Sequence, residues 1–411
     1  MSWVCCGANG HTGGRIILPA TMAGHAYIPY WLRVVFVAGV LLPSAAPAQL
    51  ILIPPTVTPA QTGYYLTPAL SVTEVYDDNV FYTPSPRTQD FLTRIRPGLK
   101  AGYQSAPLTV EGGYAFDSEI YSRHSELTDA QVRQQGSIEL KAMPIQVLTL
   151  SLPVSYFQTR TPTELNLQTG LAVGRVRAER YTANPAFTYR YDPLTTAKGD
   201  YTYAKDLLAG GITIDSHILN LALDIRLSLR DTVGPGYVGR RFEFSGFPSL
   251  TSHAFTLGWS HELTPLTTFT LRGGPRLTEG TVDRLPEASA AIRHKLKSGQ
   301  LSLSYASTLA TVFGLATAAT AQGITATAAM ELLPKLQLSA APALYTVSEP
   351  LKATVYVMNL EVSYQLTKTL AWGAAYQFSL QQGTLSGSRD VDILHNIFLI
   401  RLTVTYPVRV D

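Results

Sequence analysis

The segment from residue 353 to residue 382 places its large apolar side chains on every second residue, in two runs. The runs are ATVYVMNLEVSYQL and LAWGAAYQFSLQQ, and Thr-Lys-Thr lies between them. A period of two residues is that of a β-strand, because successive side chains point to opposite faces. Strands of soluble sheets usually have about 5–6 residues, whereas these runs reach the roughly ten residues that cross a bilayer at a tilt. The segment therefore predicts a long membrane-spanning hairpin.

Composition supports this interpretation. The chain has 411 residues, of which 46% are hydrophobic and 15% charged, and its mean hydropathy is +0.09. Soluble domains typically carry about 25% charged residues. Outside the N-terminal segment, the chain has no run of the roughly 20 apolar residues that a transmembrane helix needs. Alternating lipid-facing and lumen-facing side chains explain both facts, so we predict an all-β protein, a transmembrane antiparallel up-and-down β-barrel.

The one continuous apolar run lies near the start of the chain. Arg33 is followed by VVFVAGVLL (34–42) and by the A-x-A sequence Ala46-Pro47-Ala48. These are the parts of a secretory signal peptide, predicted at 1–48; a run of about nine residues is too short to be a membrane anchor. Met22 is a second candidate start, since the residues before it add nothing recognisable.

Cleavage would remove two arginines, Arg15 and Arg33, and no acids, which lowers the formal net charge from +3 to +1. This balance gives no reason to expect nucleic acid as a partner. Cys5 and Cys6 would be removed as well. We therefore expect neither disulfides nor thiolate chemistry in the mature chain.

Alternation and turn signals predict about eighteen strands, with sixteen as the alternative, because an even number closes a barrel without an edge. A periplasmic tail is predicted at 49–67 and the barrel at 68–411. The predicted strands are 68–76, 91–103, 107–121, 130–143, 147–158, 176–191, 195–206, 217–229, 232–244, 253–263, 267–278, 286–296, 300–309, 322–333, 336–347, 353–366, 369–382 and 394–407.

The connections between these strands alternate in length. Every second one is short, such as Gln104-Ser105-Ala106 and Pro334-Lys335, whereas the others are usually longer, such as TRTPTELNLQTGLAVGR (159–175). Outer-membrane barrels have short periplasmic turns and long extracellular loops, so this asymmetry predicts the outer membrane. The stretch STLATVFGLATAATAQG (307–323) could be either an external loop or an inward-folded constriction.

Nearly all clear strand charges fall on the parity predicted to face the lumen, since a charge on the lipid face costs about 2–4 kcal/mol at the midplane. His294, on the outward parity near a strand end, is a mild exception. Fourteen cations stand against eight acids: Arg94, Arg96, Lys100, Arg133, Lys141, Arg180, Arg190, Lys198, Arg226, Arg272, Arg276, Arg293, Lys295 and Arg401, against Glu111, Glu139, Asp200, Asp224, Glu262, Glu287, Glu331 and Glu361. The residues predicted to line a pore are Arg94, Arg96, Lys100, Arg133, Glu139, Arg226, Arg272, Arg276, Glu361 and Arg401.

Two functions are compatible with such a lumen. A water-filled channel with excess cations would favour anionic solutes by passive diffusion. Alternatively, the charges pair across strands and fill a structural barrel. A barrel of about eighteen strands is wide enough for an aqueous channel, which favours the first function.

Catalysis is not expected. His217, His253 and His395 begin predicted strands on the outer side, and Asp215 lies two residues before His217. A catalytic constellation at the rim is chemically conceivable. However, the chain has no G-x-S-x-G, H-E-x-x-H or nucleotide-binding loop. We interpret these histidines as rim residues and predict that the protein is not an enzyme.

No metal or cofactor is predicted. Asp77, Asp78 and Asn79 could offer oxygen ligands to a hard cation, but they lack the ligand spacing of an EF-hand. An Asx turn at the start of a loop is the better interpretation.

Tyrosines recur near predicted strand ends, which is typical of aromatic girdles at the two membrane interfaces. The last strand alternates outward apolar residues up to Tyr406, a pattern that outer-membrane assembly machinery reads, but PVRVD follows the aromatic residue. The tyrosines assigned to the girdles are Tyr76, Tyr103, Tyr121, Tyr156, Tyr181, Tyr191, Tyr237, Tyr345 and Tyr406.

The stretch 70–104 resembles the opening of a β-barrel porin family of Gram-negative bacteria. The matching residues are Glu74, Tyr76, Asp77, Asn79, Val80, Phe81, Asp90, Phe91, Leu92, Pro97, Gly98 and Leu99. The resemblance implies an outer-membrane barrel, and some family members are linked to exopolysaccharide synthesis and export. Taken together with the basic lumen, it leads us to expect acidic sugars or an exopolysaccharide as solutes. The competing hypothesis is a plugged barrel whose loops or tail bind a polysaccharide-export partner. The sequence does not give the oligomeric state.

Overall fold

The computed structural model describes residues 62–410 except 173, 280–285, 349–351 and 385–391. The predicted signal peptide and residues 49–61 of the predicted tail lie outside the described residues. The strand segments are β1 (Gly63–Asp77), β2 (Asp90–Gln104), β3 (Leu108–Tyr121), β4 (Asp129–Ile145), β5 (Leu148–Thr159), β6 (Ala178–Ala183), β7 (Ala186–Arg190), β8 (Thr195–Leu208), β9 (Thr213–Arg226), β10 (Asp231–Phe244), β11 (Leu250–Thr264), β12 (Thr267–Gly274), β13 (Arg276–Thr278), β14 (Glu287–Leu296), β15 (Gly299–Thr311), β16 (Ala318–Leu333), β17 (Leu336–Val347), β18 (Lys352–Gln365), β19 (Leu370–Thr384), β20 (Ile393–Thr405) and β21 (Val408–Val410). Two short 3-10 helices, η1 (Ser125–Leu127) and η2 (Pro162–Leu165), lie in the connections.

Three of the barrel strands are interrupted by a proline, so the strand segments make eighteen barrel strands. Pro185 lies between β6 and β7, Pro275 between β12 and β13, and Pro407 between β20 and β21. Proline has no backbone N–H to donate and therefore interrupts a ladder. β6 and β7 nevertheless pair with the same two neighbours, β5 and β8. The predicted eighteen strands are confirmed, and the alternative of sixteen is wrong.

The barrel closes where the last strand pairs with the first. β20 and β21 both pair antiparallel with β1, and Val408–Val410 lie opposite Tyr64–Leu66. The residues that follow Tyr406 therefore continue the last strand beyond Pro407. β1 itself begins at Gly63 rather than at the predicted Pro68. Pro68, the predicted start, lies within β1, opposite the break between β20 and β21.

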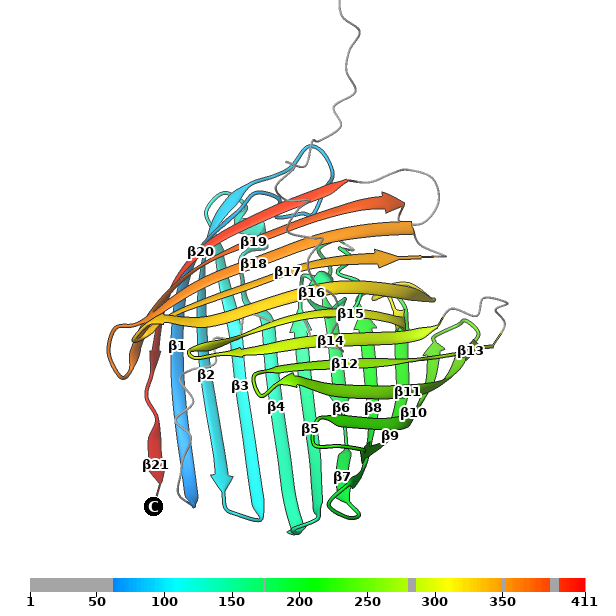
Figure 1. Cartoon of the computed structure of the whole chain (residues 1–411). Helices are drawn as coiled ribbons and strands as arrows, with labels where there is room; N and C mark the ends of the chain where they lie inside the picture. Colours follow the sequence, from blue (N-terminus) through cyan, green and yellow to red (C-terminus); the bar gives the residue numbers. More distant parts are fainter. Residues whose placement is uncertain (1–61, 173, 280–285, 349–351, 385–391, 411) are drawn as a thin grey trace, which may run out of the picture. The chain divides into compact units, whose positions relative to one another are not determined.

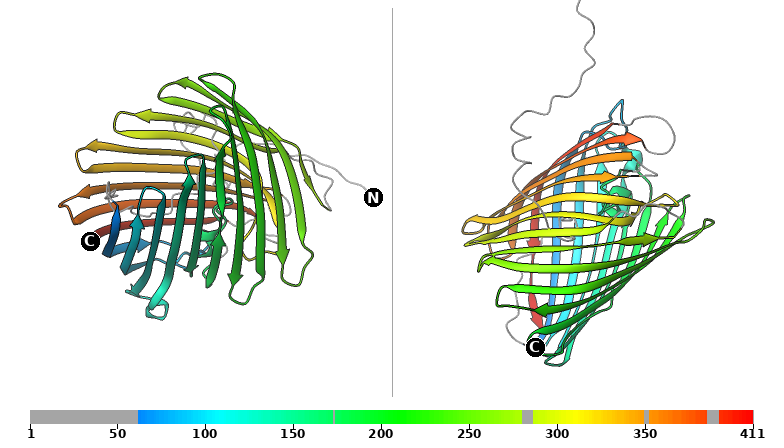
Figure 2. Two further views of the ribbon diagram at one scale, coloured as in Figure 1. Left: turned by 90° about the horizontal axis from the view of Figure 1, so that it is seen from below. Right: turned by 45° about the vertical axis from the view of Figure 1, so that its right-hand side comes forward.

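Strand tilt and the two ends of the barrel are visible in Figures 1 and 2. Strands of the near wall cross those of the far wall, as tilted strands of a closed barrel do. The described chain begins and ends at the end that carries the short turns, because Gly63 lies opposite Gln104 and Tyr64 opposite Val410. The short turns and both ends therefore face the periplasm, and the longer loops face outward.

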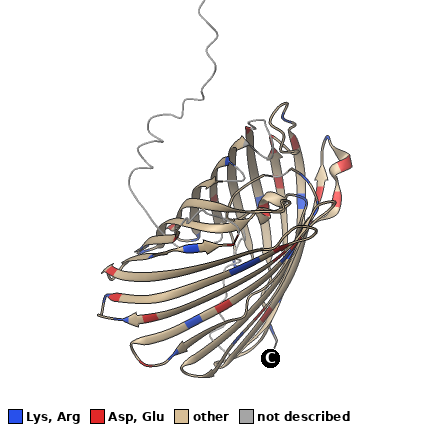
Figure 3. Cartoon of the chain, turned by 90° about the vertical axis from the view of Figure 1, so that its right-hand side faces the viewer, with Lys and Arg blue, Asp and Glu red and all other residues tan. Residues whose placement is uncertain are grey.

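The outer surface of the barrel is apolar around its middle. Leu257 and Ile400, both on the outward parity, are 67% and 58% exposed. Long stretches of the strands carry no charged residue (Figure 3). Lipid requires such an apolar belt, because a charged side chain facing it is costly. Closure of the barrel also pairs the backbone groups at this depth. The protein is an outer-membrane β-barrel. No helix among the described residues is long and apolar enough to cross a membrane.

Outward tyrosine hydroxyls bond polar side chains, as girdle residues do where lipid meets water. Tyr76 donates to Gln89, Tyr181 donates to Glu179, and Tyr237 bonds His253. Tyr121 and Tyr345 were wrongly assigned to this girdle. They point inward and are only 5% and 6% exposed, because folded-in loops cover them.

Not every outward position near the extracellular end is uncharged. Arg241 and Glu243 pair with each other there on β10, and Asp215 accepts a hydrogen bond from Tyr203. Positions this close to the loops lie at the rim, where a charge costs far less than at the midplane.

Candidate functional site

The extracellular loop between β5 and β6, residues 160–177, folds into the barrel. It begins with η2, and Leu171 at its far side is fully buried. Leu171 packs in a cluster with Val312, Val347 and Val355, which belong to the connection after β15 and to β17 and β18. This loop, named the inward segment from here on, therefore reaches from the β5 wall to the wall formed by β17 and β18.

Specific hydrogen bonds hold the inward segment in place. The Asn166 amide donates to the carbonyl of Leu171 at 2.8 Å and accepts from the backbone N–H of Phe313 at 2.8 Å. The backbone N–H of Ala172 donates to Gln381 Oε1 on β19 at 2.7 Å. Gly170 adopts φ +65°, and an added Cβ would lie 3.0 Å from the Tyr345 ring, so this turn requires glycine.

The connection between β15 and β16 also folds inward. Val312 and Phe313 are 0% and 1% exposed, and Phe313 packs with Leu165 of the inward segment. Residues 307–323 were left open between an external loop and a constriction; in the structure 307–311 and 318–323 belong to β15 and β16, and only the connection 312–317 folds inward. Next to it, Ile214, Phe242 and Leu309 form an apolar cluster at this end of the barrel. The lumen is therefore filled on this side and remains open along the opposite wall.

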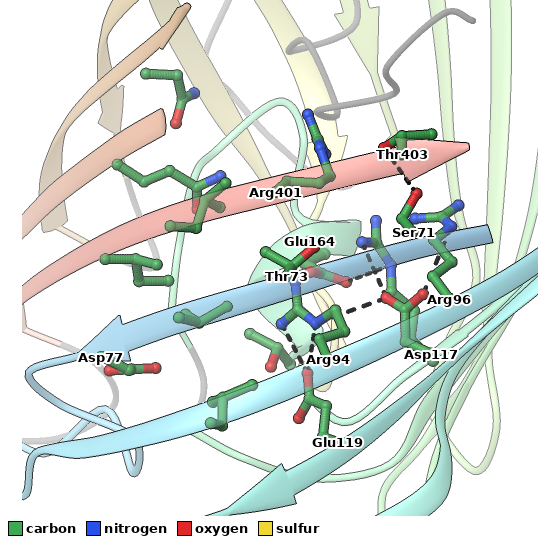
Figure 4. Close-up of a pocket in the computed structure, with 18 of the residues that line it drawn as sticks. Ser71, Thr73, Asp77, Arg94, Arg96, Asp117, Glu119, Glu164, Arg401 and Thr403 are labelled. Carbon is green, nitrogen blue, oxygen red and sulfur yellow. Dashed lines mark hydrogen bonds and ion pairs between the residues drawn. The ribbon is translucent and has the colours of Figure 1, made fainter. Parts of the chain in front are cut away.

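The open part is a cavity of about 510 Å³, bordered by β1–β4, β17–β20 and the inward segment. Its lining extends from Asp77 and His395 near the extracellular loops to Lys335 and Thr369 in periplasmic turns. Figure 4 shows the part of this cavity where the charged side chains converge.

Asp117 stands at the centre of the charged wall. Its carboxylate lies 3.8 Å from Arg94 Nε, 3.5 Å from Arg96 Nε and 3.8 Å from the Arg133 guanidinium, and its side chain is 2% exposed (Figure 4). Three guanidinium groups thus surround one buried carboxylate. None of these contacts meets hydrogen-bond geometry, and Oδ2 of Asp117 has no hydrogen-bond partner among the described residues.

The inward segment contributes charges to the same wall. Arg175 lies 3.5 Å from Glu119, which Arg94 contacts at 2.7 Å, and Glu164 lies 3.4 Å from Arg133. Burial lowers the pKa of Arg175, but Tyr121 and Glu119 raise that pKa by more, so it lies above its ordinary value and the group stays cationic. These ion pairs join the segment to β3 and β4.

The predicted pore-lining residues fall into three groups. Arg94, Arg96, Arg133 and Arg401 line the cavity. Arg401 pairs with Glu361 at 2.6 Å, and Lys100 pairs with Glu111 at 2.6 Å. The other four predicted residues do not line the cavity. Arg226 donates to backbone carbonyls of the turn that follows β9, and Glu139 is exposed. Arg272 lies against Gly258, and Arg276 is 3% exposed and bound to Glu287 and Thr320.

Sequence reasoning missed several charged residues of the lumen. Asp117 and Glu119 share the parity of Glu111 in the same strand, so alternation alone could have found them. Glu164 and Arg175 lie in a loop, where the sequence carried no signal of inward folding. Further missed luminal charges are Asp206 and Arg240, each in an ion pair with a predicted luminal residue. The cation excess of the lumen is consequently smaller than the sequence list indicated.

The three rim histidines do not come together. His217 and His253 face outward and bond Tyr201 and Tyr237 at 2.6 and 2.7 Å. His395 faces inward and bonds Asp77 at 2.7 Å. Of the constellations considered from the sequence, the structure assembles only this His–Asp pair.

The Asp77–Asp78–His395 group could offer ligand atoms within 4.8 Å of one another. The carboxylate oxygens of this group already accept hydrogen bonds from neighbouring residues. Asp77 Oδ1 accepts from the backbone N–H of Asn79, which confirms the predicted Asx turn. Asp78 accepts from both the backbone and the amide of Asn396 and from Arg87. These bonds indicate a structural role in closing the barrel seam.

No family model matches the chain, and no curated relative matches it either. Among solved structures, the chain is similar to OccAB4 from Acinetobacter baumannii, with 12% identity, a TM-score of 0.44 and coverage of 85% of this chain and 99% of that one. The anion-selective porin from Comamonas acidovorans is 10% identical, with a TM-score of 0.39 and coverage of 84% and 100%. The siderophore receptor PirA from Pseudomonas aeruginosa is 10% identical, with a TM-score of 0.43 and coverage of 83% and 80%. Similarity at this level bears on no solute or activity.

Proposed function

We propose that the protein is a narrow outer-membrane channel through which small polar solutes diffuse, with a weak preference for anions. The observation that carries this proposal is the cavity whose lining extends from the extracellular loops to the periplasmic turns. Polar and charged groups line much of it, as an aqueous passage needs.

The charges along this cavity support the anion preference. Its lining includes six cations, Arg94, Arg96, Arg133, Arg175, Lys335 and Arg401, against four acids, Asp77, Asp117, Glu119 and Glu164. Because most of the cations contact carboxylates, the remaining field is weak. We therefore expect selectivity for anions to be modest.

The test is the single-channel conductance of refolded protein, starting at Gln49, in a planar bilayer under a potassium chloride gradient. We expect a small steady conductance with an anion-favouring reversal potential. Arg96→Glu should shift the reversal potential toward cations, whereas Arg276→Gln, outside the cavity, should leave it unchanged. A folded barrel without conductance would refute the channel.

A second candidate function is a plugged barrel whose loops or N-terminal tail bind a polysaccharide-export partner. The tight packing of the inward segment, with Leu171 fully buried, favours this candidate. It predicts no conductance and binding that depends on the loops. The resemblance described above also suggests an exopolysaccharide as solute, but a polymer would have to pass the inward segment, so we favour small solutes.

A further inference from the structure

A second wall of the cavity, formed by β17–β19, carries uncharged polar side chains among apolar ones. Five side chains lining the cavity there make no side-chain hydrogen bond within the described part of the chain: Gln337, Asn359, Ser363, Gln377 and Ser379. They are half-buried or exposed, so water or a solute can reach them. Polar groups in a lumen that bond no protein partner are free to bond what passes.

These side chains fall into two groups in the sheet register. Asn359 on β18 lies directly opposite Gln377 on β19. Ser379 lies two residues beyond Gln377 on the same face of β19. Ser363 lies opposite Gln337 on β17, four residue pairs further toward the periplasmic turns, and Glu361, which pairs with Arg401, lies between Asn359 and Ser363 on the same face. Asn359, Gln377 and Ser379 therefore form one polar group, named the amide strip from here on, and Gln337 and Ser363 form a second group nearer the periplasmic turns.

The neighbouring walls differ from the amide strip in that they carry ion-paired charges or hydroxyls that bond each other. On β1 and β20, Ser71 and Thr403 hydrogen-bond each other at 3.0 Å. On β2, Arg94 and Arg96 lie beside Asp117, as Figure 4 shows, and Arg133 on β4 approaches the same carboxylate. A solute in this cavity thus meets cations on one side and unengaged amides and hydroxyls on another.

We infer that the channel selects hydroxylated carboxylic acids, with the carboxylate held toward Arg96 and Arg133 and the hydroxyl groups on the amide strip. This inference rests on the proposed function and names its solute class. A guanidinium attracts a carboxylate whatever the rest of the solute is. The amide strip adds the discrimination, since sites that bond a hydroxyl disfavour analogues without it.

Two six-carbon dicarboxylates make a matched pair of probes, because glucarate carries four hydroxyl groups and adipate carries none. Their permeabilities relative to chloride follow from reversal potentials with the potassium salts. For the unaltered protein we expect glucarate to be favoured over adipate by at least about threefold, a modest effect for hydrogen bonds that water can replace. Sorbitol, an uncharged polyol, should enter proteoliposomes more slowly than glucarate does in a swelling assay.

The double variant Asn359→Ala/Gln377→Ala should bring the glucarate-to-adipate ratio close to one and leave the potassium chloride conductance within about a factor of two, because no ion pair is lost. Gln300→Ala is the matched control. Gln300 is an exposed glutamine of β15 that does not line the cavity, so this variant should keep the ratio. Arg96→Gln should slow both acids alike.

A ratio of one in the unaltered protein, or a ratio that the double variant does not change, would overturn this inference while the channel stands. Entry of sorbitol as fast as glucarate would overturn the acid requirement. Absence of any potassium chloride conductance would instead refute the proposed function itself.

Discussion

At the scale of single residues, most luminal charges of this barrel are paired, and their burial decides what each pair contributes. Arg180 donates two hydrogen bonds to the Asp206 carboxylate, from Nε and from Nη2, each at 2.6 Å. The Asp206 side chain is 3% exposed. Lys198 contacts Asp224 at 2.6 Å, but its side chain is 53% exposed. Removing one partner of a buried pair leaves the other charge buried and unpaired, whereas an exposed pair is screened by water.

Arg180→Met should lower the free energy of unfolding by about 3–5 kcal/mol, because it leaves Asp206 buried and unpaired. The matched change Lys198→Met should cost about 0–1 kcal/mol. Urea unfolding in lipid vesicles, followed by tryptophan fluorescence, measures both. Equal effects of the two substitutions would contradict the role of burial.

Asp117→Asn should shift the reversal potential toward anions, since it removes the carboxylate that three guanidinium groups share. The control is Asp200→Asn. Asp200 bonds Asn184 and Asn220 and does not line the cavity, so its substitution should not change selectivity. Bilayer recordings under a salt gradient compare the two. A shift of equal size in both variants would show that the total charge matters rather than its place.

At the scale of elements, the inward segment determines how much of the lumen stays open. Its packing is supplemented by two polar anchors, Asn166 to Phe313 and Ala172 to Gln381. Loops of this length are usually mobile unless side chains hold them. The anchors therefore keep the bore narrow.

Asn166→Ala/Gln381→Ala should raise the single-channel conductance and its noise, because the inward segment loses its hydrogen bonds to the opposite wall. Gln382→Ala changes the neighbouring exposed glutamine of β19 and serves as control. Single-channel recording checks the prediction. An unchanged, quiet conductance in the double variant would mean that apolar packing around Leu171 suffices to hold the segment.

At the scale of the whole molecule, the apolar belt holds the barrel in the membrane. The free-energy cost of a charged side chain in this belt depends on its depth in the bilayer. Leu257 lies at the middle of β11 and is 67% exposed, whereas Leu263 lies near the periplasmic end and is 48% exposed. Both face outward. The barrel thus offers two leucines on one strand at different depths.

Leu257→Arg should destabilise the barrel by about 2–4 kcal/mol, and Leu263→Arg by about 0–1 kcal/mol, because the charge at the second position reaches the interface. Equilibrium unfolding in lipid vesicles gives both values. Equal costs would place the bilayer midplane elsewhere on β11.

The barrel could be predicted from the amino-acid sequence. Alternation over about ten residues, short turns at every second junction and charges on one parity follow from the need to separate lipid from lumen, and this need acts on each residue locally. Eighteen strands could therefore be counted before any coordinates. Even the luminal acids Asp117 and Glu119 were within reach of the same alternation.

The contents of the lumen depend on contacts between residues that are distant in the sequence. The inward folding of residues 160–177 depends on Leu171 meeting Val347 and Val355, which lie far away along the chain, and no local pattern records such a contact. The same folding buries Tyr345 and brings Arg175 to Glu119. Strand periodicity is a property of neighbours in sequence, whereas the width and charge of the passage arise from side chains that only a closed barrel brings together.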